Sequence, residues 1–320
     1  MITCIDAFKN VDIRSANKLQ LGACCLTQPR TAEKIDFYNN EYLQSIRTTW
    51  QQGIWPVSCM ACKEIEDSGG ISRRQGSNQW YADNDMYNTD VELVRIDYWT
   101  GDLCNLACTI CGPNFSSLWR QELNYPTESK KTIINNFWTA ADISRVKYVH
   151  FNGGEPLLSK EHMKFLHALP NKKHIHISYN TNGTVLPGQE LIDLWSQYKL
   201  VQIDFSIDDI GSRFEYQRYP AKWADVVENL QWFVNHAPHN CMFGVNTTVS
   251  ILNKHNLSNL YSWLQENFYV SRFTDPVEYR QQPAVGKLAT TASREIAIEF
   301  LDACDARRGT NWRTTFPELV

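Results

Sequence analysis

Long hydrophobic runs are absent from this 320-residue sequence. No stretch reaches the about 18 uninterrupted apolar residues that a membrane-spanning helix requires. The first twenty residues, MITCIDAFKNVDIRSANKLQ, hold no apolar core of signal-peptide length. We therefore expect a soluble, cytoplasmic protein with no membrane partner. Internal repeats and low-complexity segments are also lacking.

A strong charge of either sign is also missing. The formal net charge is −4, which gives no general attraction to phosphate backbones, so nucleic acid is not expected as a partner. Hydrophobic residues make up 43% and charged residues 21% of the sequence, as in a well-cored globular protein. An aromatic content of 12% argues against disorder. The length allows one large domain or two ordinary ones.

Cysteine, in contrast, is abundant. In a reducing compartment the ten cysteines are not expected to form a disulfide framework, and clustered ones more often bind metal or do redox work. The polar stretch 68–85 separates two groups of them, and two further cysteines stand alone and are expected to be buried thiols. The first group is Cys4, Cys24, Cys25, Cys59 and Cys62; the second is Cys104, Cys108 and Cys111; the isolated pair is Cys241 and Cys304.

Beyond residue 90, strand-like and helix-like segments alternate. Strands are expected at 91–99, 146–151, 174–179, 200–207 and 242–251, and helices at 160–169, 189–198, 223–236 and 257–268. Such alternation predicts an α/β fold with a parallel sheet and right-handed crossovers. Five or six units are too few for an eight-stranded barrel, so we expect a partial barrel or an open sheet.

Polar residues gather where these strands end. The cysteine loop, Asn-Gly-Gly-Glu-Pro (152–156), Asn-Thr-Asn-Gly-Thr (180–184) and Ser-Ile-Asp-Asp (206–209) each follow a predicted strand. Because the carboxyl ends of parallel strands meet at one edge, the sequence predicts a polar cofactor site there.

The spacing of Cys104, Cys108 and Cys111 allows several interpretations. On a helix the three residues would share one apolar face. Zinc would need a fourth ligand, and no Cys or His follows nearby. A thiol–disulfide pair at Cys108 and Cys111 would leave Cys104 unexplained. An iron–sulfur cluster fits best, because three thiolate ligands leave one iron open.

The Cys-x3-Cys-x2-Cys loop after one strand, with Gly153-Gly154-Glu155-Pro156 after the next, resembles the radical S-adenosylmethionine (radical SAM) superfamily over about residues 91–270. The resemblance implies a partial (β/α)6 barrel and a [4Fe–4S] cluster on Cys104, Cys108 and Cys111, whose open iron is chelated by SAM. It implies an oxidoreductase or transferase that reductively cleaves SAM to a 5′-deoxyadenosyl radical, which abstracts a substrate hydrogen. An electron donor such as flavodoxin or ferredoxin is implied as well.

The resemblance also implies a SAM pocket made of Ile110, Gly153, Gly154, Glu155, Asn180, Ser206, Asp208 and Arg218. Two glycines would let the backbone approach the cofactor closely, and Glu155 would accept from the SAM ammonium group. Ser206 and Asp208 are placed to hydrogen-bond the ribose or the methionine part, and Arg218 suits a carboxylate. Ile110 replaces the aromatic residue that the superfamily often stacks on adenine. Taken singly, each could be an ordinary turn or surface residue.

The first ninety residues resemble the SPASM/twitch modules, which bind an auxiliary cluster but usually follow the barrel. The matching features are Cys4 before Ala7-Phe8, a hairpin ending in Cys24-Cys25, and Cys59-x-x-Cys62. The resemblance implies a second [4Fe–4S] cluster on Cys4, Cys24 or Cys25, Cys59 and Cys62; zinc would also be satisfied by four thiolates. We therefore expect an auxiliary-cluster module at 1–90 and a barrel domain with a C-terminal extension at 91–320.

For function, this resemblance favours a radical SAM enzyme acting on a peptide or a small metabolite. The alternative is a non-catalytic iron–sulfur or zinc-binding protein with an electron-transfer or regulatory role. The intact Gly-Gly-Glu-Pro loop, together with Ser206 and Arg218, argues against that alternative.

Overall fold

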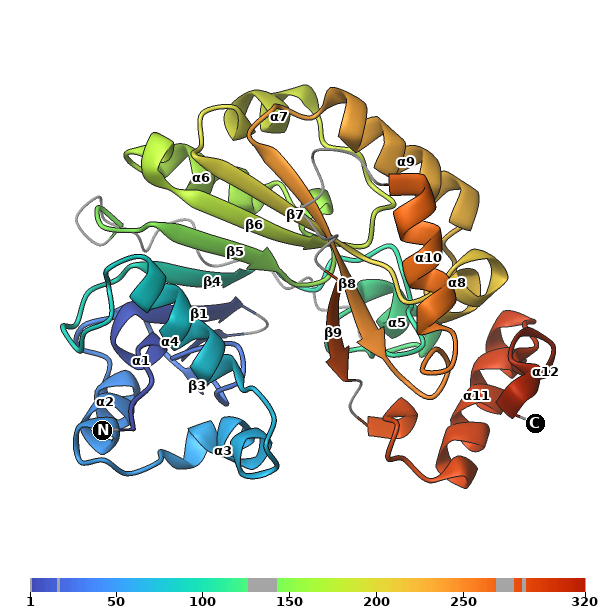
Figure 1. The fold of residues 1–320 in the computed structure, drawn as a ribbon, viewed down its shortest axis with the longest axis horizontal. Helices are drawn as coiled ribbons and strands as arrows, with labels where there is room; N and C mark the ends of the chain where they lie inside the picture. The colour runs from blue at the N-terminus through green and yellow to red at the C-terminus, as the bar shows by residue number, and fades with distance from the viewer. Residues whose placement is uncertain (1, 16–17, 126–142, 269–278, 284–285, 320) are drawn as a thin grey trace. The chain divides into compact units, whose positions relative to one another are not determined.

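The computed structural model describes residues 2–15, 18–125, 143–268, 279–283 and 286–319 (Figure 1). The chain divides into two compact units. Unit 1 comprises Met1–Gly101, Ser129–Asn152 and Glu161–Ile177, and unit 2 comprises Asp102–Glu128, Gly153–Lys160 and Ser178–Val320. Among the described helices, none is both long and apolar enough to cross a membrane.

Unit 1 is built on a mixed set of strands in the order β3-β2-β1-β4-β5. These are β1 (Asn10–Ser15), β2 (Leu19–Gly22), β3 (Arg30–Thr31), β4 (Arg95–Trp99) and β5 (Tyr148–Asn152). Strands β1, β2 and β3 pair antiparallel, whereas β1, β4 and β5 run parallel. The expected hairpin before Cys24 is confirmed by the pairing of β1 with β2.

Alternation along the parallel strands of unit 1 separates an apolar face from a polar one. Val11, Ile96 and Val149 are fully buried on the apolar face. The next residues along β1 and β4, Asp12 and Asp97, belong to the polar face. The helices of this unit are α1 (Asp6–Lys9), α2 (Glu41–Gln51), α3 (Met60–Asp67), α4 (Arg73–Asp83) and α6 (Glu161–Ala168).

The boundary expected at residue 90 is not where the structure divides. Strand β1 lies within the first ninety residues, yet it pairs in parallel with β4, which belongs to the segment expected to start the barrel. Unit 1 therefore continues past residue 90 to Gly101 and includes two later segments. Hydrogen bonding along a strand joins residues far apart in sequence, which composition alone does not reveal.

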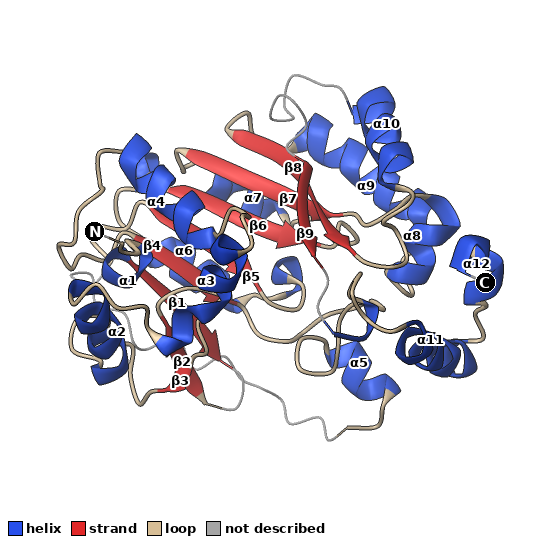
Figure 2. Cartoon of the chain, turned by 60° about the horizontal axis from the view of Figure 1, so that its bottom comes forward, coloured by secondary structure: helices blue, strands red, loops and turns tan. Residues whose placement is uncertain are grey.

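Unit 2 carries the parallel order β6-β7-β8-β9, in which β6 begins in unit 1. Its strands are β6 (His176–Thr181), β7 (Leu200–Ser206), β8 (Cys241–Val249) and β9 (Tyr279–Pro283). Its helices are α5 (Ser117–Glu122), α7 (Gln189–Trp195), α8 (Gly211–Gln217), α9 (Trp223–His236), α10 (Leu257–Phe268), α11 (Arg294–Arg308) and α12 (Trp312–Thr315). Helix α9 packs on this sheet through Phe233, whose ring lies 5.1 Å from that of Phe205 (Figure 2).

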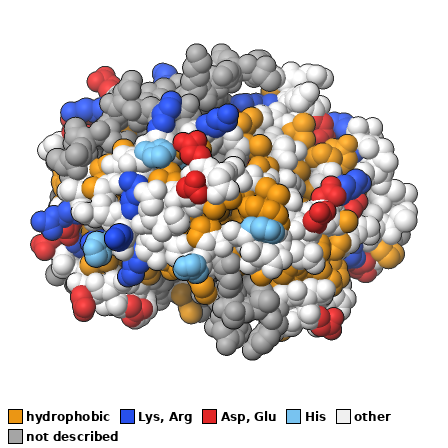
Figure 3. Space-filling model, turned by 90° about the horizontal axis from the view of Figure 1, so that it is seen from above, with side chains coloured by type: hydrophobic (Ala, Val, Ile, Leu, Met, Phe, Trp, Pro, Cys, Tyr) orange, Lys and Arg blue, Asp and Glu red, His pale blue; other side chains and the backbone are white. Residues whose placement is uncertain are grey.

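The predicted strands and helices after residue 90 are all present, although β4 and β5 start later than expected. The fold is α/β with a parallel core, as a partial barrel requires. The expectation of buried thiols at Cys241 and Cys304 is confirmed, since both are 0% exposed. On the face shown in Figure 3, basic and acidic side chains are interspersed, in line with the small net charge.

Helix α4 is tied to the start of the chain by Asn78, and this tie should contribute measurably to stability. Asn78 accepts from the Ile5 N–H and donates to the Thr3 carbonyl, both at 2.9 Å. Asn78→Ala leaves the Ile5 N–H without its partner, so we expect the free energy of unfolding to fall by about 2 kcal/mol in a urea titration. Gln79→Ala, at the exposed neighbouring position, is the control and should change it by less than about 0.5 kcal/mol. Equal effects of the two substitutions would show that the tie is not stabilising.

Candidate active site

The three clustered cysteines lie in an irregular loop between β4 and α5, not on a helix. The loop is held by backbone bonds to the segment after α8: the Ala107 N–H donates to Tyr219 O at 2.7 Å, and the Thr109 N–H donates to Gln217 O at 2.8 Å. Ser117 fixes the start of the loop, because the Ser117 hydroxyl accepts from the Cys104 N–H at 3.0 Å. The interpretation as one apolar helical face is therefore wrong.

The thiols of this loop influence one another. The pKa of Cys104 is raised to about 11, chiefly by burial, and Cys111 contributes to this rise. Burial raises the pKa of Cys108 more strongly; Arg218 opposes this, and both other thiols add to it. The structure thus places three cysteines and one guanidinium within electrostatic reach. Metal coordination or a positive ligand would be needed to make these buried thiols thiolates.

The carboxyl-terminal helix α11 clamps the same loop. Arg308 donates from Nη2 to Ala107 O at 2.7 Å, and its side chain is only 2% exposed. Its guanidinium also binds Glu122 and lies over the rings of Trp119 and Tyr219. Trp119 in turn donates from Nε1 to Cys108 O at 2.8 Å. The sequence predicts neither Arg308 nor Trp119 at the site, because their partners are backbone carbonyls, which any residue type offers.

The Gly153-Gly154 turn packs against the backbone of the cysteine loop. A Cβ at Gly154 would lie 2.3 Å from Leu103 O, and Gly153 has a φ of +137°, which favours glycine. The next residue completes the contact, because the Glu155 N–H donates to Leu103 O at 2.8 Å. The close approach predicted here is therefore made to the protein's own chain.

Glu155 is held by hydrogen bonds from its own chain. The side chain is 0% exposed, and its carboxylate accepts from the Thr181 hydroxyl at 2.8 Å, the Asn182 N–H at 2.7 Å and the Leu157 N–H at 3.0 Å. Burial raises its pKa to about 7, against the effect of these donors. Glu155 thus fastens the glycine turn to the end of β6, and its predicted contact with the SAM ammonium group stays a prediction.

Asp208 and Arg218 form a buried ion pair. Arg218 donates from Nε to Asp208 Oδ2 at 2.8 Å, and Asp208 Oδ1 accepts from the Thr248 N–H at 2.8 Å. Although burial disfavours its charged form, Asp208 and Cys108 raise the pKa of Arg218. Asp208 is 0% exposed and positions Arg218, while its predicted hydrogen bond to the ribose or the methionine part of SAM stays a prediction. The Nη atoms of Arg218 have no hydrogen-bond partner among the described residues.

Polar side chains also meet on β6, β7 and β8. Asn246 donates from Nδ2 to Asn180 Oδ1 at 2.7 Å, and it lies opposite Ser206 in the register of β7 and β8. Ser206 is half-buried. Asn182 Nδ2 lies 4.0 Å from Cys104 Sγ. Asn182 and Asn246 were not predicted; the only sequence signal was that Asn182 stands in a polar strand-end loop and Asn246 within a predicted strand.

Ile110 is half-buried and packs against the apolar cluster of the C-terminal segment. Beside it lies a cavity of about 510 Å³, lined also by Cys111, Trp119, Lys287 and Phe300. Its volume falls in the range of small-molecule and cofactor sites. The cover that Ile110 is expected to give an adenine stays a prediction.

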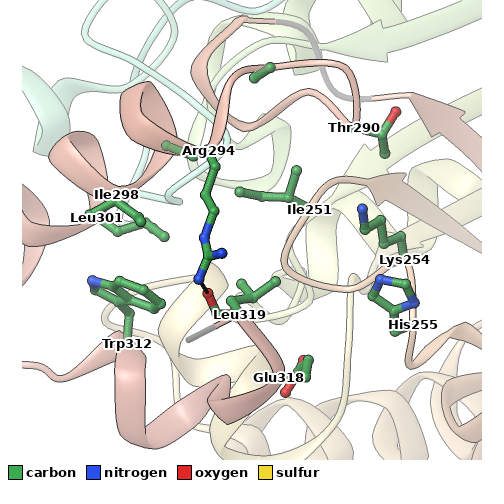
Figure 4. A pocket seen from close by; sticks show the side chains of 12 residues that line it. Ile251, Lys254, His255, Thr290, Arg294, Ile298, Leu301, Trp312, Glu318 and Leu319 are labelled. Carbon is green, nitrogen blue, oxygen red and sulfur yellow. Dashed lines mark hydrogen bonds between the residues drawn. The ribbon is translucent and has the colours of Figure 1, made fainter.

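A second cavity, of about 340 Å³, lies at the loop after β8. Figure 4 shows Lys254 and His255 on the opposite side of it from Trp312 and Leu301. The neighbouring Asn253 donates to Asp208 O at 2.9 Å, which ties this loop to the buried ion pair. None of the predicted site residues lines this second cavity.

Four of the five N-terminal cysteines line one small cavity of about 20 Å³ in unit 1; these are Cys4, Cys24, Cys59 and Cys62. Arg73 lies with them, and its charge opposes the rise that burial causes in the pKa of Cys24. Arg73 also binds Asp97 Oδ2 at 2.7 Å. Cys25 does not line this cavity; its carbonyl accepts from Arg14 at 2.6 Å. Within the described ranges, no three His, Cys, Asp or Glu side chains are grouped to hold a single metal ion.

The contact between Gly154 and Leu103 gives a direct test of the site geometry. Gly154→Ala forces a Cβ against a backbone oxygen, so we expect the free energy of unfolding to fall by about 2–3 kcal/mol. Gly112→Ala, in the cysteine loop, meets nothing within 4 Å and should leave it unchanged within about 0.5 kcal/mol. Denaturant titration of both variants measures the difference, and a neutral Gly154→Ala would contradict the described packing.

Comparison with known proteins places this site in a family. The sequence model of the Radical SAM superfamily matches residues 100–260, which is about half of the chain. The GTP 3′,8-cyclase of Actinobacillus pleuropneumoniae serotype 3 is 28% identical over 122 residues, covering 35% of this chain and 32% of the cyclase. The GTP 3′,8-cyclase of Clostridium acetobutylicum is 30% identical over 129 residues, covering 40% and 38%. The chain thus spans about a third of the length of these curated relatives.

Solved structures give low-identity matches. Streptococcus suis SuiB bound to precursor peptide SuiA matches with a TM-score of 0.43 and 14% identity, over 100% of this chain and 75% of SuiB. Native anSMEcpe with bound AdoMet matches with a TM-score of 0.41 and 15% identity, over 68% and 62% of the two chains. The family match covers the cysteine loop, the glycine turn, and the Asp208 and Arg218 pair. The protein therefore belongs to the Radical SAM superfamily.

Proposed function

We propose that this enzyme holds its [4Fe–4S] cluster through Cys104, Cys108 and Cys111 and binds SAM beside them through the Arg218 guanidinium. Its reaction would be the removal of a hydrogen atom from a peptide or small-metabolite substrate. The observation that carries the proposal is that the three thiols of one loop and the Arg218 guanidinium, at the end of α8, act on one another's charge.

The residues present fit a cluster with one open iron. Three thiols supply three ligands, and Cys104 Sγ accepts from the Leu106 N–H at 3.4 Å, a contact that stabilises a thiolate. The Arg218 guanidinium would offset part of the negative charge that three thiolates bring into a buried site. Reduced by one electron, the cluster supplies the electron that splits SAM into methionine and a 5′-deoxyadenosyl radical.

Arg218 would bind the methionine carboxylate of SAM. Its Nε is occupied by Asp208, which leaves the Nη atoms for a planar anion. Asp208 is itself fixed by the Thr248 N–H, so the guanidinium is held before a ligand arrives. We assign to Asp208 and Glu155 the positioning of other groups, because both carboxylates are fully buried and bonded within the chain.

The nucleoside part of SAM would face Asn180, Asn246, Ser206 and Ile110. Asn180 and Asn246 bond to each other, and Asn246 Oδ1 is buried without a partner, so it can accept from a ribose hydroxyl. Ser206 offers a half-buried hydroxyl on the adjacent strand. Ile110 would give an aliphatic cover to the adenine. The two Gly residues would shape the turn, through the backbone contact with Leu103.

We further propose a second [4Fe–4S] cluster on Cys4, Cys24, Cys59 and Cys62. These four line one cavity and Cys25 does not, which favours Cys24 as the ligand from the hairpin. Four cysteine ligands would leave no iron open, so this cluster suits electron transfer. Arg73 is the cation beside it and would balance its negative charge.

For the substrate, the SPASM/twitch resemblance of residues 1–90 favours a peptide. The curated relatives are GTP 3′,8-cyclases, which makes a nucleotide the leading small-molecule candidate. The match covers only about a third of their length. A one-electron donor such as flavodoxin or ferredoxin would supply the electron that reduces the cluster. The rest of the chain's contribution is to orient SAM and to exclude water.

Replacing all three residues of the loop tests the first proposal. Anaerobically reconstituted wild-type protein should bind about eight irons, four for each cluster. The variant with Cys104, Cys108 and Cys111 changed to Ala should lose about half of this iron and all 5′-deoxyadenosine formation, because the open iron is lost. Iron analysis and chromatography of the SAM products measure both. Continued SAM cleavage by the variant would rule the assignment out.

Two adjacent cysteines provide a matched test of the second cluster. Cys24→Ala should lose about half of the reconstituted iron, whereas Cys25→Ala should keep about eight irons. Iron content and the electron paramagnetic resonance (EPR) signal of the reduced protein report the difference. The reverse pattern would make Cys25 the ligand, and retention of zinc in place of iron would contradict an iron–sulfur cluster at this site.

A further inference from the structure

We propose that the cavity of about 340 Å³ at the loop after β8 binds a small amphipathic anion. Such a ligand carries a carboxylate or phosphate group on an apolar body. The C-terminal cavity, as we call it, is lined by residues 251, 254 and 255 of that loop and by residues of the segment 290–319, which holds α11 and α12. Its volume lies within the range of small-molecule sites.

The C-terminal cavity is separate from the residues assigned to SAM, none of which lines it. Ile110 packs on the same apolar cluster as this cavity, but it lines the 510 Å³ cavity beside Cys111 instead. The two cavities share no lining residue. We therefore expect a ligand in the C-terminal cavity and SAM to be bound at the same time.

The floor of the C-terminal cavity is apolar. Trp312 and Leu301 are each 1% exposed. Ile251 and Ile298 are half-buried and line the cavity as well. The indole N–H of Trp312 already donates to Asp302 Oδ1 at 2.7 Å, so the ring offers the cavity no donor. These side chains suit the apolar body of a ligand, because its burial removes apolar surface from water.

Two exposed basic side chains face this floor. Lys254 and His255 lie across the cavity from Trp312 (Figure 4). Neither side chain has a hydrogen bond or an ion pair within the part of the chain that the structure describes. An ammonium group and an imidazole ring next to each other suit an oxyanion, since hydrogen bonds to a charged oxygen are strong.

The charge balance of the lining also favours an anion. Arg294 reaches from α11 across the cavity, and its Nη2 donates to Leu319 O at 3.1 Å (Figure 4). Glu318 is the only carboxylate among the described lining residues, and Arg213 binds it at 2.7 Å. With this carboxylate matched, the charges of Lys254 and Arg294 are in excess, in a chain whose net charge is −4. A negative ligand is therefore attracted to this cavity.

The turn that carries the two basic side chains, residues 250–256, is tied to the buried ion pair. Asn253 is 0% exposed and donates from Nδ2 to Asp208 O and to Thr248 O, both at 2.9 Å. Asp208 in turn accepts from Arg218 Nε at 2.8 Å. A ligand that joins the turn to α11 and α12 would restrict the backbone beside Asp208 and so help to hold Arg218 in place.

Arg213 adds a second connection between the cavity and the ion pair. Its Nη2 donates to Leu252 O in the same turn and to Glu318 in the cavity, both at 2.7 Å. Its Nε donates to Asp209 Oδ2 at 2.9 Å, and Asp209 is the neighbour of Asp208 in the sequence. The cavity, the turn and the ion pair are thus joined by hydrogen bonds.

Occupation of the C-terminal cavity should therefore favour SAM binding. This expectation rests on the proposed function, which assigns the methionine carboxylate of SAM to Arg218. A guanidinium that is held before SAM arrives loses less conformational freedom when SAM binds. Because coupling between two sites is reciprocal, SAM should raise the affinity for the anion by the same factor.

Three probes of matched shape test the site in the reconstituted full-length enzyme. 1-Naphthaleneacetate and 1-naphthyl phosphate carry the two anionic groups on one apolar ring system, and 1-naphthaleneacetamide is the neutral analogue. We expect at least one anion to bind about tenfold more tightly than the amide at low salt, with a smaller difference at high salt. Equilibrium dialysis measures the three affinities, and the tighter anion identifies carboxylate or phosphate as the recognised group.

Charge reversal beside the cavity locates the bound probe. Lys254→Glu should weaken anion binding about tenfold and leave amide binding unchanged, and His255→Glu should act in the same direction. Lys199→Glu is the matched control, because it makes the same charge change at an exposed lysine that lines none of the three cavities. Equal affinities of wild type for anion and amide overturn the proposal, as does a Lys254→Glu effect no larger than that of Lys199→Glu.

Titration of SAM with and without the tighter anion tests the connection to Arg218. Saturating anion should tighten SAM binding about fivefold in the wild type and have no such effect in Lys254→Glu. Competition between the anion and SAM would overturn the proposal, because the cavity would then be part of the cofactor pocket. Simultaneous binding with unchanged SAM affinity would refute the connection through the turn.

The same measurements separate this proposal from the proposed function. A wild-type enzyme that binds the anion through Lys254 but binds no SAM would refute the proposed function and leave the C-terminal cavity as a ligand site. A wild-type enzyme that binds and cleaves SAM, but binds neither anion more tightly than the amide, would refute the C-terminal cavity alone.

Discussion

The site depends on one buried cation. Arg218 is 8% exposed, and Asp208 is the only carboxylate that binds it among the described residues. Its charge also lowers the pKa values of Cys108 and Cys111, against the larger rise that burial causes. A buried charge is costly unless it is matched, and the ion pair with Asp208 supplies that match. This requirement explains why thiols, carboxylate and guanidinium occur together in one loop system.

The geometry around this charge is set by backbone contacts more than by side chains. Gly154 allows the glycine turn to lie against Leu103, and Arg308 holds Ala107 O from the far end of the chain. Trp119 binds the carbonyl of Cys108 itself. The cysteines therefore project from a loop fixed on several sides, which is the condition for a cluster whose open iron must meet its ligand in one orientation.

Much of the fold could be predicted, because the periodicity of hydrophobic residues and the composition at strand ends are local properties of the sequence. The strands that end at Asn152 and Ser206 follow directly from alternation, and the polar loops after them mark one edge of the sheet. The tertiary partners could not be predicted. Glu155 accepts from the Asn182 N–H and Asp208 from the Thr248 N–H, which lie 27 and 40 positions further along the chain. Tertiary hydrogen bonds of this kind leave no periodic signal.

The N-terminal region shows the same limit. The hairpin before Cys24 could be predicted, but the parallel pairing of β1 with β4 could not, because either edge of a strand can pair. Similarly, Asn246 was unmarked in the sequence, since an Asn within a strand points to either face depending on register. The doublet Cys24-Cys25 became distinguishable only when one of the two lined a cavity with three other cysteines.

The central claim is that three thiols leave one iron open for SAM. Electron–nuclear double resonance of the reduced enzyme, with SAM carrying ¹⁵N in its amino group and ¹⁷O in its carboxylate, tests it most directly. The account predicts hyperfine coupling of both labels to the cluster of the Cys104–Cys111 loop. A spectrum that SAM leaves unchanged would contradict it.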